Sequence, residues 1–172
     1  MKLLHKRPAT TLVEILIYFV LLALLLFTFL SFSIQIGDLY GETTNFYEVE
    51  YSVSFVHDRL EATLLEATAV DEATTVTGVP EGALGLTVSD VFATPTRFYS
   101  SGGVLYMQEG AAAAVALTPG TILVDSFQVR VLESALGSQQ IQVDGEFSAF
   151  GVDRVEMEAS YPFHWTFTLR TL

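Results

Sequence analysis

The sequence predicts an α+β fold, in which one long helix is followed by an antiparallel β-sheet. Two patterns predict it: apolar residues recur every three or four positions up to about residue 64, and they alternate with polar ones from about residue 84. A third observation is that the 22 residues from Ile15 to Ile36 carry no charge. The helix is therefore expected to be apolar all round at first and then amphipathic, covering one face of the sheet.

Composition and charge exclude several classes of protein. The 172 residues include 8 Lys plus Arg against 20 Asp plus Glu, for a net charge of −12. This acidity argues against nucleic acid as a partner, because phosphate binding needs clustered basic side chains. The 13 Phe, the 7 Tyr and a mean hydropathy of +0.45 argue against intrinsic disorder. Because the sequence contains no cysteine, disulfides, thiolate metal sites and cysteine nucleophiles are excluded.

The uncharged stretch is expected to cross a membrane as a helix. Its 22 residues would extend about 33 Å, which is enough for a hydrocarbon core of about 30 Å. The stretch is longer than the apolar part of a cleaved secretory signal, about 7–15 residues, and no small-residue cleavage site follows it. Lys2, Lys6 and Arg7 precede it, so the positive-inside rule predicts a cytoplasmic N-terminus and an extracytoplasmic remainder.

Glu14 stands at the very start of this apolar stretch. A carboxylate near hydrocarbon costs at least about 2.5 kcal/mol unless it is paired or reaches the interface. Two interpretations are open. Either Glu14 lies in an interfacial first turn, where the helix dipole favours an acidic side chain, or it pairs with a positive group for a functional purpose.

The segment from Arg7 to Glu14, RPATTLVE, leads directly into the apolar stretch and resembles the class III signal of type IV pilins and type II secretion pseudopilins. The resemblance implies that a prepilin peptidase cuts between Ala9 and Thr10 and N-methylates Thr10. It also implies that Glu14 is the assembly carboxylate, neutralised by the N-terminal amine of a neighbouring subunit. Ala9 replaces the usual glycine of this signal, and Thr10 replaces the common Phe or Met.

The resemblance further implies the lollipop architecture of this family. We expect a leader at 1–9, a hydrophobic transmembrane and assembly helix at 10–37, an amphipathic helix at 38–73 and a β-rich head at 74–172. The expected role is a structural minor subunit of a type IV pilus or type II secretion pseudopilus, held in the cytoplasmic membrane before filament assembly. Its partners would be other pilin or pseudopilin subunits, the prepilin peptidase and an inner-membrane assembly platform. The alternative is a single-pass membrane-anchored extracytoplasmic binding protein that does not polymerise.

The periodicities also predict individual elements. Gly37 and Gly41 could mark a bend in the helix, and Gly78-Val79-Pro80 is a turn signal. The amphipathic face of the helix comprises Phe46, Val49, Val53, Val56, Leu60 and Leu64. Strands are expected at 84–88, 97–99, 104–107, 127–131, 141–143, 154–161 and 165–170, with Ser101-Gly102-Gly103 as a hairpin turn.

No residue pattern predicts catalysis, a cofactor or a resident metal ion. The sequence contains neither a glycine-rich phosphate loop nor a Gly-x-Ser-x-Gly elbow, so the chain is expected not to be an enzyme. His57-Asp58 is interpreted as an exposed polar pair on the helix. His164 is interpreted as a residue that packs or caps at the start of a strand.

Two further clusters have two interpretations each. Asp144, Glu146 and Asp153 are interpreted as part of a solvated turn, with a calcium-binding loop as the alternative. The small residues Ala111–Ala114 form either a loop packed at a subunit interface or an ordinary loop.

Overall fold

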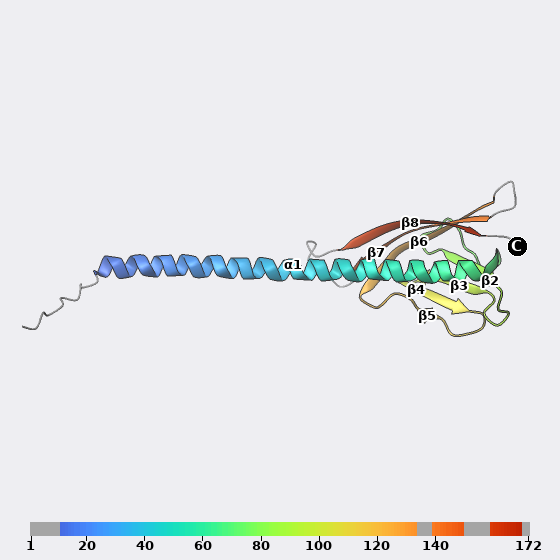
Figure 1. Cartoon of the computed structure of the whole chain (residues 1–172), viewed down its shortest axis with the longest axis horizontal. Coiled ribbons are helices and arrows are strands. Elements are labelled where there is room, and N and C mark those ends of the chain that lie inside the picture. The colour runs from blue at the N-terminus through green and yellow to red at the C-terminus, as the bar shows by residue number, and fades with distance from the viewer. Residues whose placement is uncertain (1–10, 134–138, 150–158, 170–172) are drawn as a thin grey trace, which may run out of the picture. The chain divides into compact units, whose positions relative to one another are not determined.

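The computed structural model describes residues 11–133, 139–149 and 159–169 (Figure 1). The chain divides into two compact units, Met1–Gly41 and Glu42–Leu172. One long helix, α1, contributes its first part to the first unit and its second part to the second, and the strands all belong to the second. The α+β class predicted from the sequence is confirmed. The elements are, in order, α1(Leu12–Glu66), β1(Ala67–Val70), β2(Ala83–Val88), β3(Thr96–Ser101), β4(Val104–Glu109), β5(Val115–Ala116), β6(Ile122–Glu133), β7(Gln139–Ala149) and β8(Ser160–Leu169).

The first unit consists, in its described part, of the apolar half of α1. The segment Leu12–Gly37 has a mean hydropathy of 2.8, none of its most apolar window is buried, and it is long and apolar enough to cross a membrane. By length and composition it indicates a membrane anchor. The helix continues through Gly37 and Gly41, where the sequence suggested a bend, and the division between the units falls directly after Gly41.

In the second unit, α1 buries the face that its periodicity predicted. Val49, Val53, Val56, Leu60 and Leu64 are all at most 9% exposed. Phe46, the first residue of the predicted face, is 45% exposed and contacts the ring of Tyr161 on β8 at a centroid distance of 6.4 Å. A spacing of three and four residues places these side chains on one side of the helix, which faces the strands.

The helix ends at Glu66, seven residues before the end expected at 73. The next four residues form strand β1, which pairs antiparallel with β2. Ala67 and Val70 of this strand are buried in the core. Sheet pairing therefore overrides the weak helical pattern of Ala67–Val70, in which Thr68 and Val70 are β-branched residues that favour strands.

The strands form two antiparallel sheets, whereas a single sheet was expected. The first has the order β1-β2-β3-β4-β5 and the second the order β6-β7-β8. Strands β3 and β4 form the predicted hairpin, with Ser101 opposite Val104 and with Gly102 and Gly103 at φ values of 60° and 76°. Two consecutive residues with positive φ are the signature of a two-residue type I′ turn.

The second sheet differs from the prediction in its last strand. Two strands were expected at 154–161 and 165–170, but the ten residues Ser160–Leu169 form one uninterrupted strand, β8, paired with β7 throughout. Residues 154–158 and 170 lie outside the described residues. Pro162 does not interrupt the strand, because β8 is an edge strand of its sheet and so tolerates a residue without an amide hydrogen.

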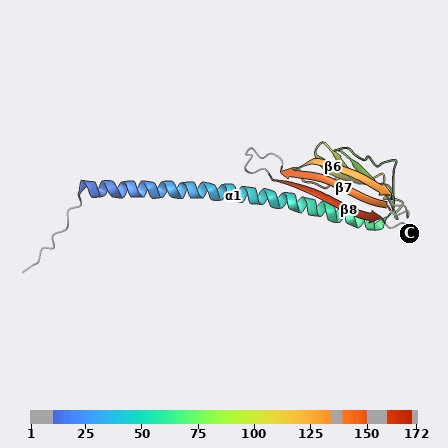
Figure 2. The ribbon, with the colours of Figure 1, turned by 90° about the horizontal axis from the view of Figure 1, so that it is seen from above.

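The residues between β1 and β2 connect the two sheets. The amide of Gly82 donates to the carbonyl of Phe127 on β6 at 2.8 Å, and the amide of Phe127 donates to the carbonyl of Pro80 at 2.7 Å. The hydrophobic core comprises buried side chains from both sheets and from α1, including Phe98, Phe127 and Phe147. Figure 2 shows the second half of α1 running along one side of the strands, so this helix segment has one face on the core and one face outward.

Candidate functional site

Thr11 caps the N-terminus of α1. The amide of Glu14 donates to the Thr11 carbonyl at 3.0 Å and lies 3.4 Å from the Thr11 hydroxyl oxygen. Threonine followed three residues later by glutamate is the spacing of a capping box, in which the hydroxyl satisfies an amide of the first turn. This cap was not predicted, although the spacing of Thr11 and Glu14 is visible in the sequence.

Glu14 is exposed in the first turn of α1, and it is the only charged residue between positions 11 and 37. The described residues of the first unit include no Lys, Arg or His. The polar Thr28 in the same segment satisfies its hydroxyl within the helix by donating to the Leu24 carbonyl at 2.8 Å. Ala9 and Thr10, the expected processing residues, lie outside the described residues.

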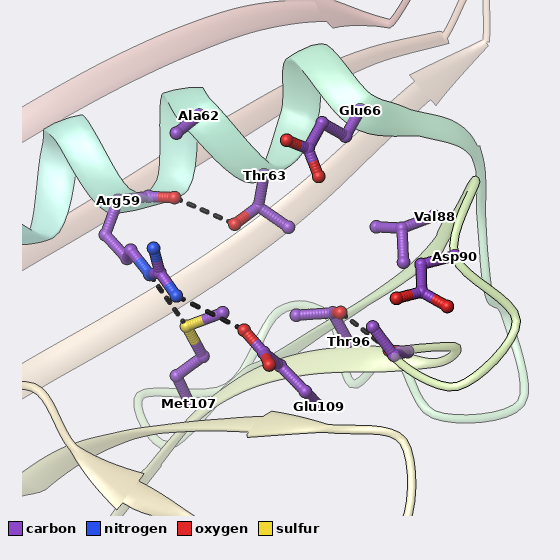
Figure 3. Close-up of a pocket in the computed structure, with 10 residues that line it drawn as sticks. Arg59, Ala62, Thr63, Glu66, Val88, Asp90, Thr96, Met107 and Glu109 are labelled. Carbon is purple, nitrogen blue, oxygen red and sulfur yellow. Dashed lines mark hydrogen bonds and ion pairs between the residues drawn. The ribbon is translucent and has the colours of Figure 1, made fainter.

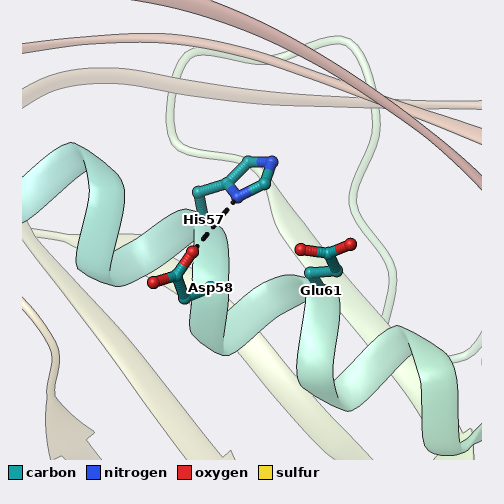
Figure 4. A group of neighbouring side chains, drawn as sticks. All are labelled: His57, Asp58 and Glu61. Carbon is teal, nitrogen blue, oxygen red and sulfur yellow. Dashed lines mark ion pairs between the residues drawn. The ribbon is translucent and has the colours of Figure 1, made fainter.

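His57 is not the exposed residue that the sequence suggested. Its side chain is 35% exposed, and its ring packs edge-on against Trp165 at a centroid distance of 5.1 Å and, tilted by 38°, against Phe167 at 5.5 Å, both on β8. Asp58, by contrast, is 82% exposed and lies 3.6 Å from His57, measured between Asp58 Oδ1 and His57 Nδ1. The aromatic residues of β8 therefore half-bury the ring of His57, whereas Asp58, its ion-pair neighbour in Figure 4, stays exposed.

Ligand atoms of His57, Asp58 and Glu61 lie within 4.8 Å of one another, a separation at which one metal ion could be held (Figure 4). This group was not predicted, although the spacing of His57 and Glu61 by four residues places both on one side of a helix. Asp58 and Glu61 are both exposed, and exposed acidic groups of this kind are common without a bound ion.

Asp144 and Glu146 are in the middle of strand β7, so the predicted solvated turn is wrong; Asp153 lies outside the described residues. Asp144 stands directly opposite His164 of β8 and makes a short contact with its Nδ1, and it is 3.9 Å from Arg130 of β6. His164 thus pairs with Asp144 of the neighbouring strand instead of packing or capping at the start of a strand. Glycine separates the two acidic residues because a side chain at Gly145 would meet the ring of Phe163 and the carbonyl of Ser126.

A cleft of about 200 Å³ lies between α1 and the first sheet (Figure 3). Arg59 contacts Glu109 there, with 3.2 Å between Nη2 and Oε1, and Glu66 and Asp90 supply two more carboxylates. The two hydroxyl groups of the lining are occupied: Thr63 donates to the Arg59 carbonyl at 2.9 Å and Thr96 to the Ala93 carbonyl at 2.8 Å.

No protein-family model, no curated protein and no solved structure matches this chain.

Proposed function

We propose that the chain is a structural minor pilin-like subunit of a type IV pilus or type II secretion pseudopilus. A prepilin peptidase removes residues 1–9 and methylates Thr10. Before assembly the subunit is held in the cytoplasmic membrane, with its N-terminus on the cytoplasmic side and its head on the extracytoplasmic side. It then enters a filament through the helix that begins near Glu14, together with other pilin or pseudopilin subunits and an inner-membrane assembly platform. The role is structural and not enzymatic.

The observation that carries this proposal is the isolation of Glu14. It is the only charge in an apolar helix segment, and the described residues of its unit contain no cation. A carboxylate that leaves water requires an opposite charge with good geometry, because desolvation otherwise exceeds the Coulombic gain. The amine of a processed neighbouring N-terminus would supply that charge. Such pairing lets a subunit enter only where its carboxylate meets an amine, and so sets the register of assembly.

The α+β fold supports the same proposal, since a long helix with an apolar first part and an antiparallel β head are the parts that the resemblance implies. Removal of Lys2, Lys6 and Arg7 would leave 5 basic and 20 acidic residues, a net charge of −15. Strongly acidic heads repel one another, which argues for a minor subunit among other subunits and against a filament made mainly of this chain.

One observation favours the second candidate, a single-pass anchored binding protein that does not polymerise. The Thr11 cap gives Glu14 a local explanation, since glutamate at this position of a capping box stabilises the helix N-terminus without a partner molecule. Such a protein needs no processing and would keep its basic residues Lys2, Lys6 and Arg7.

The N-terminal mass of the protein recovered from membranes that contain a prepilin peptidase separates the two candidates. A chain that begins at Thr10, with or without one added methyl group, supports the pilin pathway. A matched Ala9→Leu variant should keep its leader, since a bulky residue replaces the small one before the cut. If the unmodified protein begins at Met1 in these membranes, the pilin proposal fails and the anchored binding protein replaces it.

A further inference from the structure

The outward face of α1 in the second unit carries a row of large apolar side chains. Tyr47, Tyr51 and Leu65 are 64%, 72% and 82% exposed, and Phe55 is 43% exposed. A helix advances about 100° per residue, so this row lies roughly opposite the buried Val53 and Leu60. We call this row the outer seam: Tyr47, Tyr51, Phe55, Asp58, Ala62 and Leu65.

The spacing of the outer seam fits a second helix. From Tyr51 to Leu65 its members are separated by four, three, four and three residues, which is the alternation of a coiled-coil interface. The α1 segment needs only its inner face to cover the strands, and the outer seam has no role in the core of the second unit. A helical partner would bury the exposed rings of Tyr51 and Phe55 between its own apolar side chains.

An apolar groove adjoins the outer seam. Phe55 also lines an apolar groove of about 390 Å³ between α1 and the β4–β5 region, together with Ala112, Ala113 and Val115. Val115 is 63% exposed, and it belongs to the two-residue edge strand β5. Of the small residues Ala111–Ala114, Ala112 and Ala113 therefore line a groove that adjoins the outer seam at Phe55.

The charges on the outer seam indicate which kind of partner helix it can bind. Asp58 stands in the centre of the outer seam with its side chain 82% exposed, and a carboxylate oxygen of the exposed Glu61 lies within 4.8 Å of its own. Glu48 and Glu66 are exposed elsewhere on the same helix. The neighbouring Arg59 is already paired with Glu109 at 3.2 Å. A second copy docked through the same seam would bring like charges together, whereas a Lys or Arg opposite Asp58 would complement it.

We propose that the outer seam binds a helix of a different protein, one whose apolar seam carries a Lys or Arg opposite Asp58. A polar pair at one such position fixes the register of two helices, and the flanking acidic residues select a basic partner. The proposal does not rest on the proposed function, because all the residues involved lie in the second unit and would serve a filament subunit and an anchored binding protein alike.

The test is photo-crosslinking of the full chain in the membranes of its own cells. p-Benzoylphenylalanine replaces Tyr51, which keeps an aromatic side chain at the seam. A matched control carries the same probe at Phe92, which is 92% exposed on the loop between β2 and β3 and is not a member of the outer seam. The adduct is digested and its crosslinked segment is identified by mass spectrometry. We expect an adduct from position 51, but not from position 92, with a helical segment of another protein that contains Lys or Arg.

Two variants test whether the negative charge of Asp58 contributes to binding of the partner helix. Asp58→Lys should lower the adduct yield from position 51 about tenfold, because like charges then face each other, and Asp58→Glu should preserve it. Since Asp58 is exposed, resistance of the second unit to protease should stay unchanged in both variants. The proposal is overturned by an adduct with a second copy of this chain or with lipid, by the absence of an adduct, by a partner segment without a basic residue, or by an Asp58→Lys yield equal to that of the unmodified protein.

Discussion

His57 of α1 packs edge-on against Trp165 of β8, with ring centroids 5.1 Å apart and ring planes inclined by 73°. This contact joins the second half of the helix to the three-stranded sheet. The geometry places the edge of one ring against the other, the arrangement that aromatic quadrupoles favour. Arg59, two residues further along the helix, contacts Met107 and Glu109 of β4, so neighbouring helix residues attach α1 to both sheets.

Replacement of His57 should therefore loosen the helix from the second sheet. We expect His57→Ala to lower the free energy of unfolding by about 1–2 kcal/mol, because it removes ring contacts with both Trp165 and Phe167. Trp165 is the only tryptophan of the chain, so its fluorescence during urea unfolding reports the change directly. Asp58→Ala is the matched control, expected to stay within about 0.5 kcal/mol. Equal stabilities of the two variants would show that the ring contact contributes nothing.

Sequence patterns correctly predicted those parts of the fold that depend only on residues close together in the sequence. The spacing of Val49, Val53, Val56 and Leu60 identified the buried face of α1, because a regular helix converts that spacing into one side. The hairpin at Gly102 was predicted for the same reason, since a pair of glycines adopts positive φ without steric cost.

The hairpin turn gives a second prediction. Gly103 has a φ of 76°, and a side chain there would stand 2.4 Å from Leu123 Cδ1. Gly103→Ala should lower the free energy of unfolding by about 1–2 kcal/mol, the cost of a left-handed conformation for an L-residue. Gly102→Asn is the control, because nothing lies within 4 Å of Gly102 and asparagine tolerates a positive φ. Urea unfolding should rank Gly102→Asn close to the unmodified protein; the reverse order would refute the assignment of this turn.

Gly145 gives a third prediction. A Cβ atom at this position would lie 2.6 Å from the Ser126 carbonyl and 2.3 Å from the Phe163 ring. Because the first of these neighbours is backbone in an adjacent strand, the sheet itself must shift. Gly145→Ala should therefore cost about 1–3 kcal/mol in urea unfolding. Gly120→Ala, with nothing within 4 Å of the position, should be nearly neutral, and a comparable loss in both variants would contradict the steric explanation.

The features that the sequence did not predict depend on contacts between residues that are far apart in the sequence. Asp144 and Glu146 suggested a turn because acidic residues around a glycine are common in turns, yet β6 and β8 pair with this segment on both sides. His57 looked like a surface residue because its attachment to Trp165 spans more than 100 positions. The expected role of Glu14 depends on a second molecule, which neither the periodicity nor the fold of one chain contains.

Glu14 gives the last prediction, which concerns assembly. Glu14→Gln removes the charge but keeps a side chain that can serve in a capping box, since glutamine occurs at that position as well as glutamate. If an N-terminal amine of a neighbour pairs with Glu14, Glu14→Gln should enter filaments at least about tenfold less, because an uncompensated buried amine costs about 3–5 kcal/mol. The measurement is the share of the chain in sheared filaments relative to the membrane fraction.

Thr28→Val is the matched control, because it removes a polar group from the same apolar segment without changing charge. It should leave filament entry unchanged. Thr11→Val removes the capping hydroxyl and keeps Glu14, so a pairing role predicts nearly normal entry once its N-terminal processing has been verified. If instead Thr11→Val and Glu14→Ala impair the protein equally while Glu14→Gln behaves like the unmodified chain, Glu14 acts through the helix cap, and the pairing role is refuted.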